Sequence, residues 1–452
     1  MRSLIRLALP IVAVQVGLMM MGVVDTLMVG RVSAAALAAV ALGNIYFFCV
    51  AIFAMGVLIS LDPIISQAVG ARDDRAIARG LQRGLLLAVI LAVSSLVPLL
   101  VVEPFITLLR QPADVVPMAA GYVHAATPGI LALLCFVVLR HTLQAMDRVR
   151  PIVLTIILGN LVNVALNWVL VFGRFGFPAL GPVGTGWASS LSRWTMLVTL
   201  VLVTLPHMGR YLRPAGREVL RLRPLGRMLR LGLPVGAQLE LQLGAFAAVA
   251  VVMGWLGTAE MAGHQIAINL ASLTFMVPLG VAQAASVRVG QAIGRQSPAT
   301  ARGSATAALF SGGAFMSLTA LTFIALPGAL TALYTSEPAV VLVAVALIPV
   351  AGVFQVFDGL QVVASGVLRG VGDTMAPFVA NLVAFWAIGM PAGLYLCFRT
   401  PAGAVGLWWG LVAALAVSSV FLVARVRATM RRDLRRIMID DDMTGPPALT
   451  AA

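Results

Sequence analysis

The sequence has few charged residues, no lysine and only three cysteines, and these shortages narrow the classes of protein that it encodes. Charged residues fill 11% of the 452 positions, whereas apolar residues fill 60% and the mean hydropathy is +1.00. A soluble domain carries about 25% charged residues, so this composition excludes a water-soluble globular protein. We therefore expect an integral membrane protein.

The sequence also lacks the motifs of common catalytic and metal sites. Cys49, Cys135 and Cys397 lie in separate apolar runs, which gives neither a disulfide framework nor a metal-binding spacing. There is no nucleophile elbow, phosphate loop, His-Glu-x-x-His motif or CxxC pair. We predict that the protein is not an enzyme and needs no cofactor, and we assign no residues to a metal site.

Apolar runs of membrane-spanning length recur along the whole chain. A bilayer core needs about 20 predominantly apolar residues per spanning helix, and twelve runs meet that requirement. The expected spans are 5–28, 43–66, 82–102, 119–140, 152–173, 183–205, 231–255, 262–287, 304–326, 341–366, 375–397 and 403–425. The sequence therefore predicts an all-α fold.

The net charge of +14 comes from arginine alone, and the positions of the arginines explain it better than nucleic-acid binding does. With a cytoplasmic N-terminus, 26 of the 31 arginines fall on the cytoplasmic side. Arg31, Arg110, Arg174 and Arg399 fall on the other side, and Arg193 falls within the sixth span. This asymmetry follows the positive-inside rule, so we predict that both termini are cytoplasmic and that arginines contact lipid headgroups.

The two halves of the chain repeat each other at an offset of 224 residues. The matching segments are 7–10 with 231–234, 67–70 with 291–294 and, after a one-residue slip, 78–80 with 301–303. Six spans per half is an even number, which predicts two homologous lobes related by a pseudo-twofold axis along the membrane normal. The expected organisation is a first lobe at 1–205, a basic cytoplasmic loop at 206–230, a second lobe at 231–425, and a basic tail at 426–452 that is disordered at its end.

Four acidic residues lie within or near the ends of predicted spans, where an ionised side chain costs several kcal/mol and is usually functional. They are Asp25, Asp62, Glu240 and Asp358, of which Asp358 is nearest the middle of its span. Asn163 and Asn167 lie one helical turn apart, so their carboxamides share a face that could hold a carboxylate or an ion. The alternative for each residue is a structural contact between helices.

These residues together resemble the multidrug and toxic compound extrusion (MATE) transporters, most closely the bacterial NorM-type branch. The resemblance runs nearly end to end. The segments that carry it are Val24–Gly30, Gln67–Ala71, Asn163 and Asn167 with the glycine-rich 173–186, His264–Asn269, Gln355–Asp358 and Leu368–Thr374.

The resemblance implies an antiporter of twelve helices that exports small cationic drugs or dyes in exchange for protons or sodium ions. It assigns cation or proton coupling to Asp25, Asn163 and Asn167 in the first lobe, and to Asp358 with a glutamate of the seventh span in the second, for which Glu240 is the candidate in this chain. It also suggests a substrate cavity with contributions from Gln242, Asp62, Gln265, Asn269 and Gln355. It further implies a monomer in the bacterial inner membrane.

One residue departs from the family pattern. The family has a glutamate in the seventh span at the position of Gln242, whereas this chain has its glutamate at Glu240. Two residues turn a helix by about 200°, so Glu240 is expected to face away from the family's site unless the helix is kinked.

Two other functions fit the sequence less well. A flippase for a lipid-linked precursor would need cationic cavity residues, for which Arg140 and Arg193 are the candidates. A non-transporting scaffold or receptor would have no need for buried acids in both halves.

Overall fold

A computed structural model describes residues 2–108, 111–213 and 217–440. Helices, and no strands, make up the secondary structure of these ranges. The first half contains α1 (Arg2–Val29), α2 (Ala34–Leu58), α3 (Leu61–Gly70), α4 (Asp74–Leu100), α5 (Val102–Leu108), α6 (Val115–Ala126), α7 (Gly129–Ala145), α8 (Arg150–Phe172), α9 (Pro182–Leu212) and η1 (Arg217–Leu220). The second contains α10 (Leu222–Leu256), α11 (Thr258–Gly294), α12 (Pro298–Ala325), α13 (Pro327–Ala332), α14 (Pro338–Val371), α15 (Met375–Asn381), η2 (Leu382–Gly389), α16 (Met390–Arg399) and α17 (Gly403–Met430).

The described helices account for all twelve expected spans. Eleven helical segments are long and apolar enough to cross a membrane, and α6 with α7 forms a twelfth that bends by 48°. Pro128 lies in the break between α6 and α7, where a proline cannot continue the backbone hydrogen bonds of a helix. The all-α, multi-pass membrane fold predicted from the sequence is therefore confirmed.

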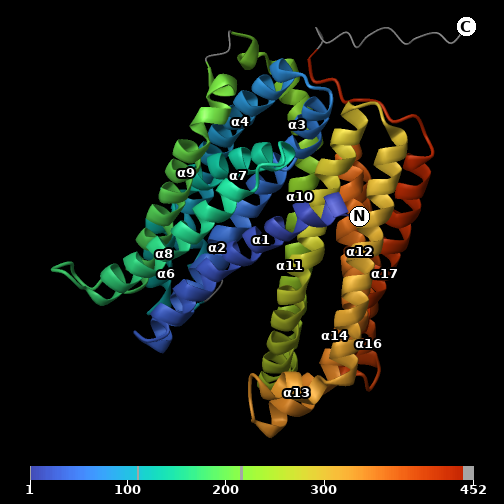
Figure 1. The fold of residues 1–452 in the computed structure, drawn as a ribbon. Helices are drawn as coiled ribbons and strands as arrows, with labels where there is room; N and C mark the ends of the chain where they lie inside the picture. The colour runs from blue at the N-terminus through green and yellow to red at the C-terminus, as the bar shows by residue number, and fades with distance from the viewer. Residues whose placement is uncertain (1, 109–110, 214–216, 441–452) are drawn as a thin grey trace, which may run out of the picture.

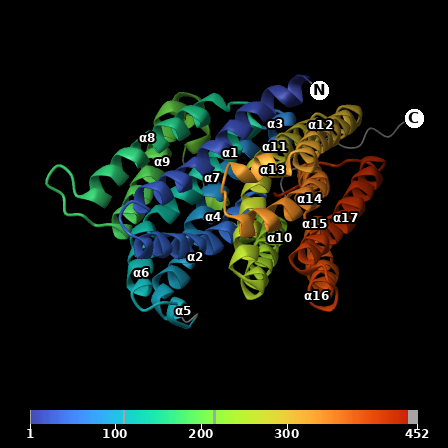
Figure 2. The same cartoon turned by 90° about the horizontal axis from the view of Figure 1, so that it is seen from below.

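The helices form two groups that lie side by side. Figures 1 and 2 show α1–α9 in one group and α10–α17 in the other, which we call the first and second lobes. We call one end of the molecule the basic end, because it holds the α3–α4 turn, the segment between α9 and α10, and the chain after α17. The opposite end, which holds the α1–α2 turn and α13, is the far end (Figure 1).

The lobes approach each other closely where α3 crosses α11 near the basic end. A Cβ atom added to Gly70 would lie 2.1 Å from the carbonyl oxygen of Gln291, and one added to Gly294 would lie 2.0 Å from that of Gln67. These contacts are reciprocal, because Gln67 and Gly70 are the repeat partners of Gln291 and Gly294. Small residues let the two backbones touch, as they do in many membrane helix pairs.

A second close crossing joins α2 of the first lobe to α10 of the second. A Cβ atom on Gly56 would lie 2.6 Å from the Cα atom of Gly236, and one on Gly232 would lie 2.3 Å from the carbonyl oxygen of Val57. Both crossings lie in the half of these helices nearer the basic end, whereas the ribbons of the two lobes diverge toward the far end in Figure 1.

The basic segments at the lobe boundaries are largely helical. Helix α9 continues to Leu212 and α10 begins at Leu222, so residues 206–212 and 222–230 of the expected loop belong to two long helices, and Arg217–Leu220 form a short 3-10 helix. Helix α17 ends at Met430, and the chain from Arg431 to Asp440 continues without helix. The disorder expected at the end of the tail falls on residues outside the described ranges.

The close crossing of α3 and α11 predicts that Gly70→Ala destabilises the protein by about 1–3 kcal/mol, because the added methyl group collides with backbone. The measurement is thermal unfolding in detergent. Gly303→Ala is the control, since a Cβ atom there meets nothing within 4 Å. An equal melting temperature for both variants would contradict the close approach.

Candidate ion and substrate site

Asp25 on α1 of the first lobe is a buried carboxylate held by three neutral hydrogen-bond donors. The side chain is 6% exposed. Its Oδ1 accepts hydrogen bonds from Nδ2 of Asn163 at 3.1 Å and of Asn167 at 2.8 Å. Its Oδ2 accepts one from Oγ of Ser189 at 2.6 Å. Helices α1, α8 and α9 therefore meet at one carboxylate, as the sequence predicted for α1 and α8.

Glycines bring these helices close enough for short polar side chains to reach each other. A Cβ atom on Gly17 of α1 would lie 2.5 Å from Ile156 of α8, and one on Gly159 of α8 would lie 2.5 Å from Met196 of α9. Nδ2 of Asn160 also donates a hydrogen bond to the carbonyl of Gly17 at 2.9 Å. The three helices are thus fixed in register around Asp25.

The surroundings of Asp25 leave oxygen atoms free for a cation. The amide oxygens of Asn163 and Asn167 are buried without a hydrogen-bond partner among the described residues. Arg193 lies close enough for its charge to act on Asp25, and its guanidinium stacks 4.2 Å from the centre of the Phe47 ring. Within the described ranges, no group of three His, Cys, Asp or Glu residues is arranged to hold a metal ion.

The second lobe has its own buried acid at Asp358 on α14. The side chain is 5% exposed, and its Oδ1 has no hydrogen-bond partner among the described residues. Gln355 lies one turn earlier, and its Oε1 accepts hydrogen bonds from Thr274 at 2.6 Å and from Thr319 at 3.1 Å. Oε1 of Gln355 is therefore committed to α11 and α12, whereas Nε2 of Gln355 and Oδ1 of Asp358 have no described partner, which leaves Asp358 capacity for a proton or a ligand.

Glu240 lies on α10 between the lobes and is only half-buried. Its Oε2 has no hydrogen-bond partner among the described residues, and its charge acts on Cys49 of α2 in the first lobe. In the described part of the chain, no hydrogen bond or ion pair joins Glu240 to Asp358. Gln242, two residues later, is also half-buried. The orientation of the glutamate relative to the family's position stays a prediction.

The remaining cavity candidates occupy different places. Asp62 on α3 is fully buried, and its Oδ1 lies 2.6 Å from Nδ1 of His141 on α7, so its described partner is not part of the Asp25 cluster. Gln265 and Asn269 are exposed on one face of α11, with Nε2 of Gln265 at 3.5 Å from Oδ1 of Asn269. A hydrogen bond at that distance is weak. Both side chains lie on the surface of the described structure.

Comparison with known proteins follows the same two-lobe division. The MatE family model matches residues 10–169 and again residues 234–394. The two matches start 224 residues apart, which is the repeat offset read from the sequence. The chain belongs to the MatE family. This membership confirms the resemblance to MATE transporters, and it places the chain among transporters rather than enzymes.

Curated relatives cover almost the whole MATE chain. The Multidrug resistance protein MdtK of Pectobacterium atrosepticum is 34% identical over 446 residues, covering 97% of each chain. The Multidrug resistance protein NorM of Burkholderia vietnamiensis is 36% identical over 429 residues, covering 93% of this chain and 92% of the relative.

Solved MATE structures share the fold at lower identity. The crystal structure of the eukaryotic MATE transporter AtDTX14 matches with a TM-score of 0.87 and 22% identity, covering 97% of this chain and 98% of that one. An outward-facing conformation of a multidrug resistance MATE family transporter matches with a TM-score of 0.85 and 20% identity, covering 95% of both chains. Both likenesses concern the fold.

Sequence reasoning missed three polar partners in this MATE chain. Ser189, which completes the Asp25 cluster, lies one turn before Arg193, and that spacing was the available signal. His141 is the partner of Asp62 and follows Arg140 directly. Asn381, at the end of α15, accepts hydrogen bonds from Gln361 and Ser418 in the second lobe, at 3.0 and 2.8 Å. The contacts of Asn381 join three helices, and no local sequence pattern predicts them.

The geometry around Asp25 predicts a coupling free energy of about 1 kcal/mol between Asp25 and Asn167, because one hydrogen bond joins them inside the membrane. A double-mutant cycle of Asp25→Ala and Asn167→Ala, measured by unfolding in detergent, gives this value. The control cycle combines Asp25→Ala with Asn160→Ala, because the described bonds of Asn160 are to backbone carbonyls. Additive effects in both cycles would contradict the contact.

Proposed function

We propose that this MATE protein is a secondary active multidrug efflux antiporter. It exports lipophilic organic cations in exchange for protons or sodium ions by alternating access. The relatives named as multidrug resistance proteins support the substrate class, because they match nearly the whole chain at 34–36% identity. We propose further that it works as a monomer in the bacterial inner membrane, since one chain supplies a buried acid in each lobe.

The observation that carries the proposal is the environment of Asp25. A carboxylate that is buried in a membrane span and bonded only by Asn163, Asn167 and Ser189 has no acid–base partner that neutralises it in full. Such a group lowers its free energy by taking up a proton or a cation. Sodium prefers oxygen ligands, and the unpartnered amide oxygens beside Asp25 are of that kind.

Coupling arises because one carboxylate serves both ligands. A coupling ion and a cationic drug that need the same charge cannot occupy a lobe together, so the arrival of one favours release of the other. The ion shifts the balance between outward- and inward-facing states only as far as its affinity differs between them. We assign this role to Asp25 with Asn163 and Asn167, and to Asp358 with Glu240.

The polar residues of the wider cavity have a different part in the proposal. Gln265 and Asn269 are exposed on α11, and Gln242 is half-buried on α10, so each is available to orient a drug. Gln355 and Asp62 already have partners, and we propose that they position helices near the cavity. The flippase alternative loses support from Arg140, whose guanidinium is bonded to Gln15 and His141.

We also propose that the basic end faces the cytoplasm. The three stretches 72–83, 210–230 and 425–436, which meet at this end, carry 17 of the 31 arginines. A cytoplasmic basic end satisfies the positive-inside rule and brings those arginines to anionic headgroups. The close crossings of α3 with α11 and of α2 with α10 then seal the cytoplasmic side.

Ethidium efflux from reconstituted liposomes tests the antiport. A proton or a sodium gradient should drive efflux by the native protein, and Asp25→Asn and Asp358→Asn should reduce it to the level of protein-free liposomes. Each substitution removes the charge that binds both ligands. Glu240→Gln should also reduce efflux, and comparison with Gln242→Ala separates the two positions on α10.

Asp114→Asn is the matched control, because this exposed carboxylate precedes α6 and should leave efflux unchanged. Folded Asp25→Asn and Asp358→Asn proteins that pump ethidium at the native rate would refute the coupling role. A native protein that moves ethidium under neither gradient would refute the proposed substrate class.

The proposed orientation predicts opposite accessibility of cysteines placed at the two ends. Leu222, at the start of α10, and Leu333, after α13, are 82% and 77% exposed. In intact cells, an impermeant maleimide should label Leu333→Cys and spare Leu222→Cys, and lysis should make both reactive. Labelling of Leu222→Cys in intact cells would reverse the orientation.

A further inference from the structure

The chain after α17 does not leave the molecule but crosses to the other lobe. We call residues Arg431–Asp440 the strap. Figure 1 shows it running from the end of α17 over the basic end toward α3 and α4. The backbone N–H of Ile437 donates to Oε1 of Gln67 on α3 at 2.7 Å. Nε2 of the same Gln67 donates to the carbonyl of Gly370 on α14 at 3.0 Å. Gln67 thus binds the strap and the second lobe at once.

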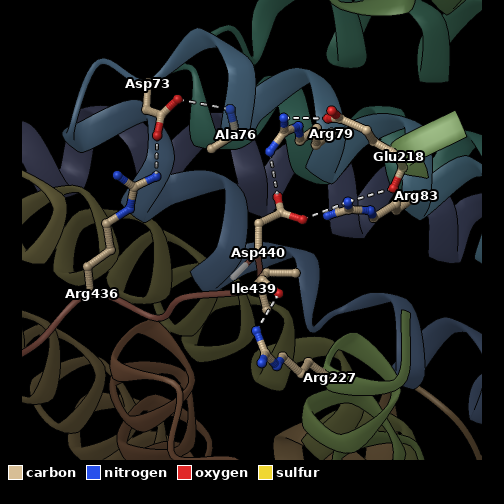
Figure 3. A network of polar contacts seen from close by, with 9 residues as sticks. All are labelled: Asp73, Ala76, Arg79, Arg83, Glu218, Arg227, Arg436, Ile439 and Asp440. Atoms are coloured by element: carbon tan, nitrogen blue, oxygen red, sulfur yellow. Dashed lines mark hydrogen bonds and ion pairs between the residues drawn. The ribbon is translucent and has the colours of Figure 1, made fainter. Parts of the chain in front are cut away.

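The strap ends in an acid that lies between two arginines of the first lobe. Figure 3 shows Asp440 facing Arg79 and Arg83 of α4. Its Oδ1 is 2.7 Å from Nη2 of Arg83, and its Oδ2 is 3.3 Å from Nη1 of Arg79. Arg83 is 1% exposed and Asp440 is 7% exposed, so this pair is shielded from water. Shielded charges that lose their partner are far costlier than exposed ones.

A second ion pair holds the middle of the strap. Nη2 of Arg436 lies 2.9 Å from Oδ2 of Asp73, and Oδ1 of Asp73 caps α4 by accepting from the N–H of Ala76 at 3.0 Å (Figure 3). Both charged side chains are about one quarter exposed, at 23% and 25%. This pair is therefore weaker than the ion pair of Asp440 with Arg83.

The second lobe binds the strap as well. Nε of Arg302 on α12 donates to the carbonyl of Met430 at 2.6 Å, where the strap begins. Nη1 of Arg227 on α10 donates to the carbonyl of Ile439 at 2.8 Å (Figure 3). The side chain of Ile437 covers Gly372 at the end of α14. The strap is thus built into the contact between the lobes rather than laid on one of them.

We propose that the strap is a latch that holds the lobes together at the basic end and so favours the conformation in which that end is closed. This inference rests on the alternating access proposed above. The lobes cannot part at this end unless the strap releases either its contacts with α3 and α4 of the first lobe or its contacts with α10 and α12 of the second. The shielded Asp440 contact is the main energetic element of the latch.

The carboxylate of Asp440 keeps its charge in the ordinary pH range. Burial alone would raise the pKa of Asp440, but hydrogen bonds and positive charge from Arg83 and Arg79 outweigh it and hold the pKa below its usual value. A lowered carboxyl pKa stabilises the latched form above the ordinary value of about 4, and the effect is lost as pH falls through the lowered pKa. Asp440 therefore stays charged at neutral pH.

The test measures the separation of the far ends by double electron–electron resonance. Spin labels at Val32 and Leu333, which are 44% and 77% exposed, report the two lobes in a protein whose three native cysteines are replaced. Truncation after Met430 removes the strap, and truncation after Asp440 is the matched control that keeps it. Loss of the strap should lower the ratio of long to short distances about fivefold or more.

Asp440→Asn tests the latch without shortening the chain, and it should lower the same ratio by about twofold or more, because Arg83 and Arg79 lose the negative charge of Asp440. If both Asp440→Asn and the protein ending at Met430 keep the distance distribution of the protein ending at Asp440, the latch is refuted. If the shorter chain does not fold, Asp440→Asn alone decides. The measurement needs no substrate, so a failed efflux assay would not alter its meaning.

Discussion

Asp25 brings a carboxylate into a membrane span, where an uncompensated charge costs several kcal/mol, and the first lobe is organised around meeting that cost. Three neutral side chains offset this cost by donating hydrogen bonds to the carboxylate of Asp25. Their side chains are short, so α1, α8 and α9 must lie in near contact, and Gly17 and Gly159 permit this. The hydrogen bonds to Asp25 therefore depend on the close packing of these three helices.

The two halves of the chain match in how their helices cross but differ in where their buried acidic residues lie. Gly70 and Gly294 make reciprocal contacts across the α3–α11 crossing, as expected for two halves of common origin. The buried acids do not follow the repeat, since Asp25 lies on the first span and Asp358 on the tenth. Asp25 has three donors, whereas Oδ1 of Asp358 has no described partner. The lobes thus present two chemically different sites.

The sequence was sufficient for features that depend on local pattern. Apolar runs predicted the twelve spans because hydropathy and length are properties of each segment alone. The one-turn spacing of Asn163 and Asn167 predicted a shared polar face, and the structure places both on Asp25. The 48° bend between α6 and α7 was not predicted, although Pro128 lies within that span and was a local signal for it.

Contacts between distant segments were not predictable from one sequence. The pairing of Arg79 with Asp440 joins residues 361 positions apart, and that of Asp62 with His141 joins residues 79 apart. Periodicity says nothing about such pairs. The tail was therefore interpreted from its arginines alone, whereas the structural role of the strap depends on its acid, Asp440.

The two arginines of α4 explain why a latch belongs at this place. The segment after α9 and the strap after α17 follow the last helix of each lobe, and both reach Arg79 and Arg83. Nη2 of Arg79 lies 2.5 Å from Oε2 of Glu218, and Arg83 donates to the Glu218 carbonyl at 2.9 Å. Glu218 lies on the chain that joins the two lobes, whereas Asp440 lies beyond the last described helix, so Asp440 can separate from α4 without straining that connection.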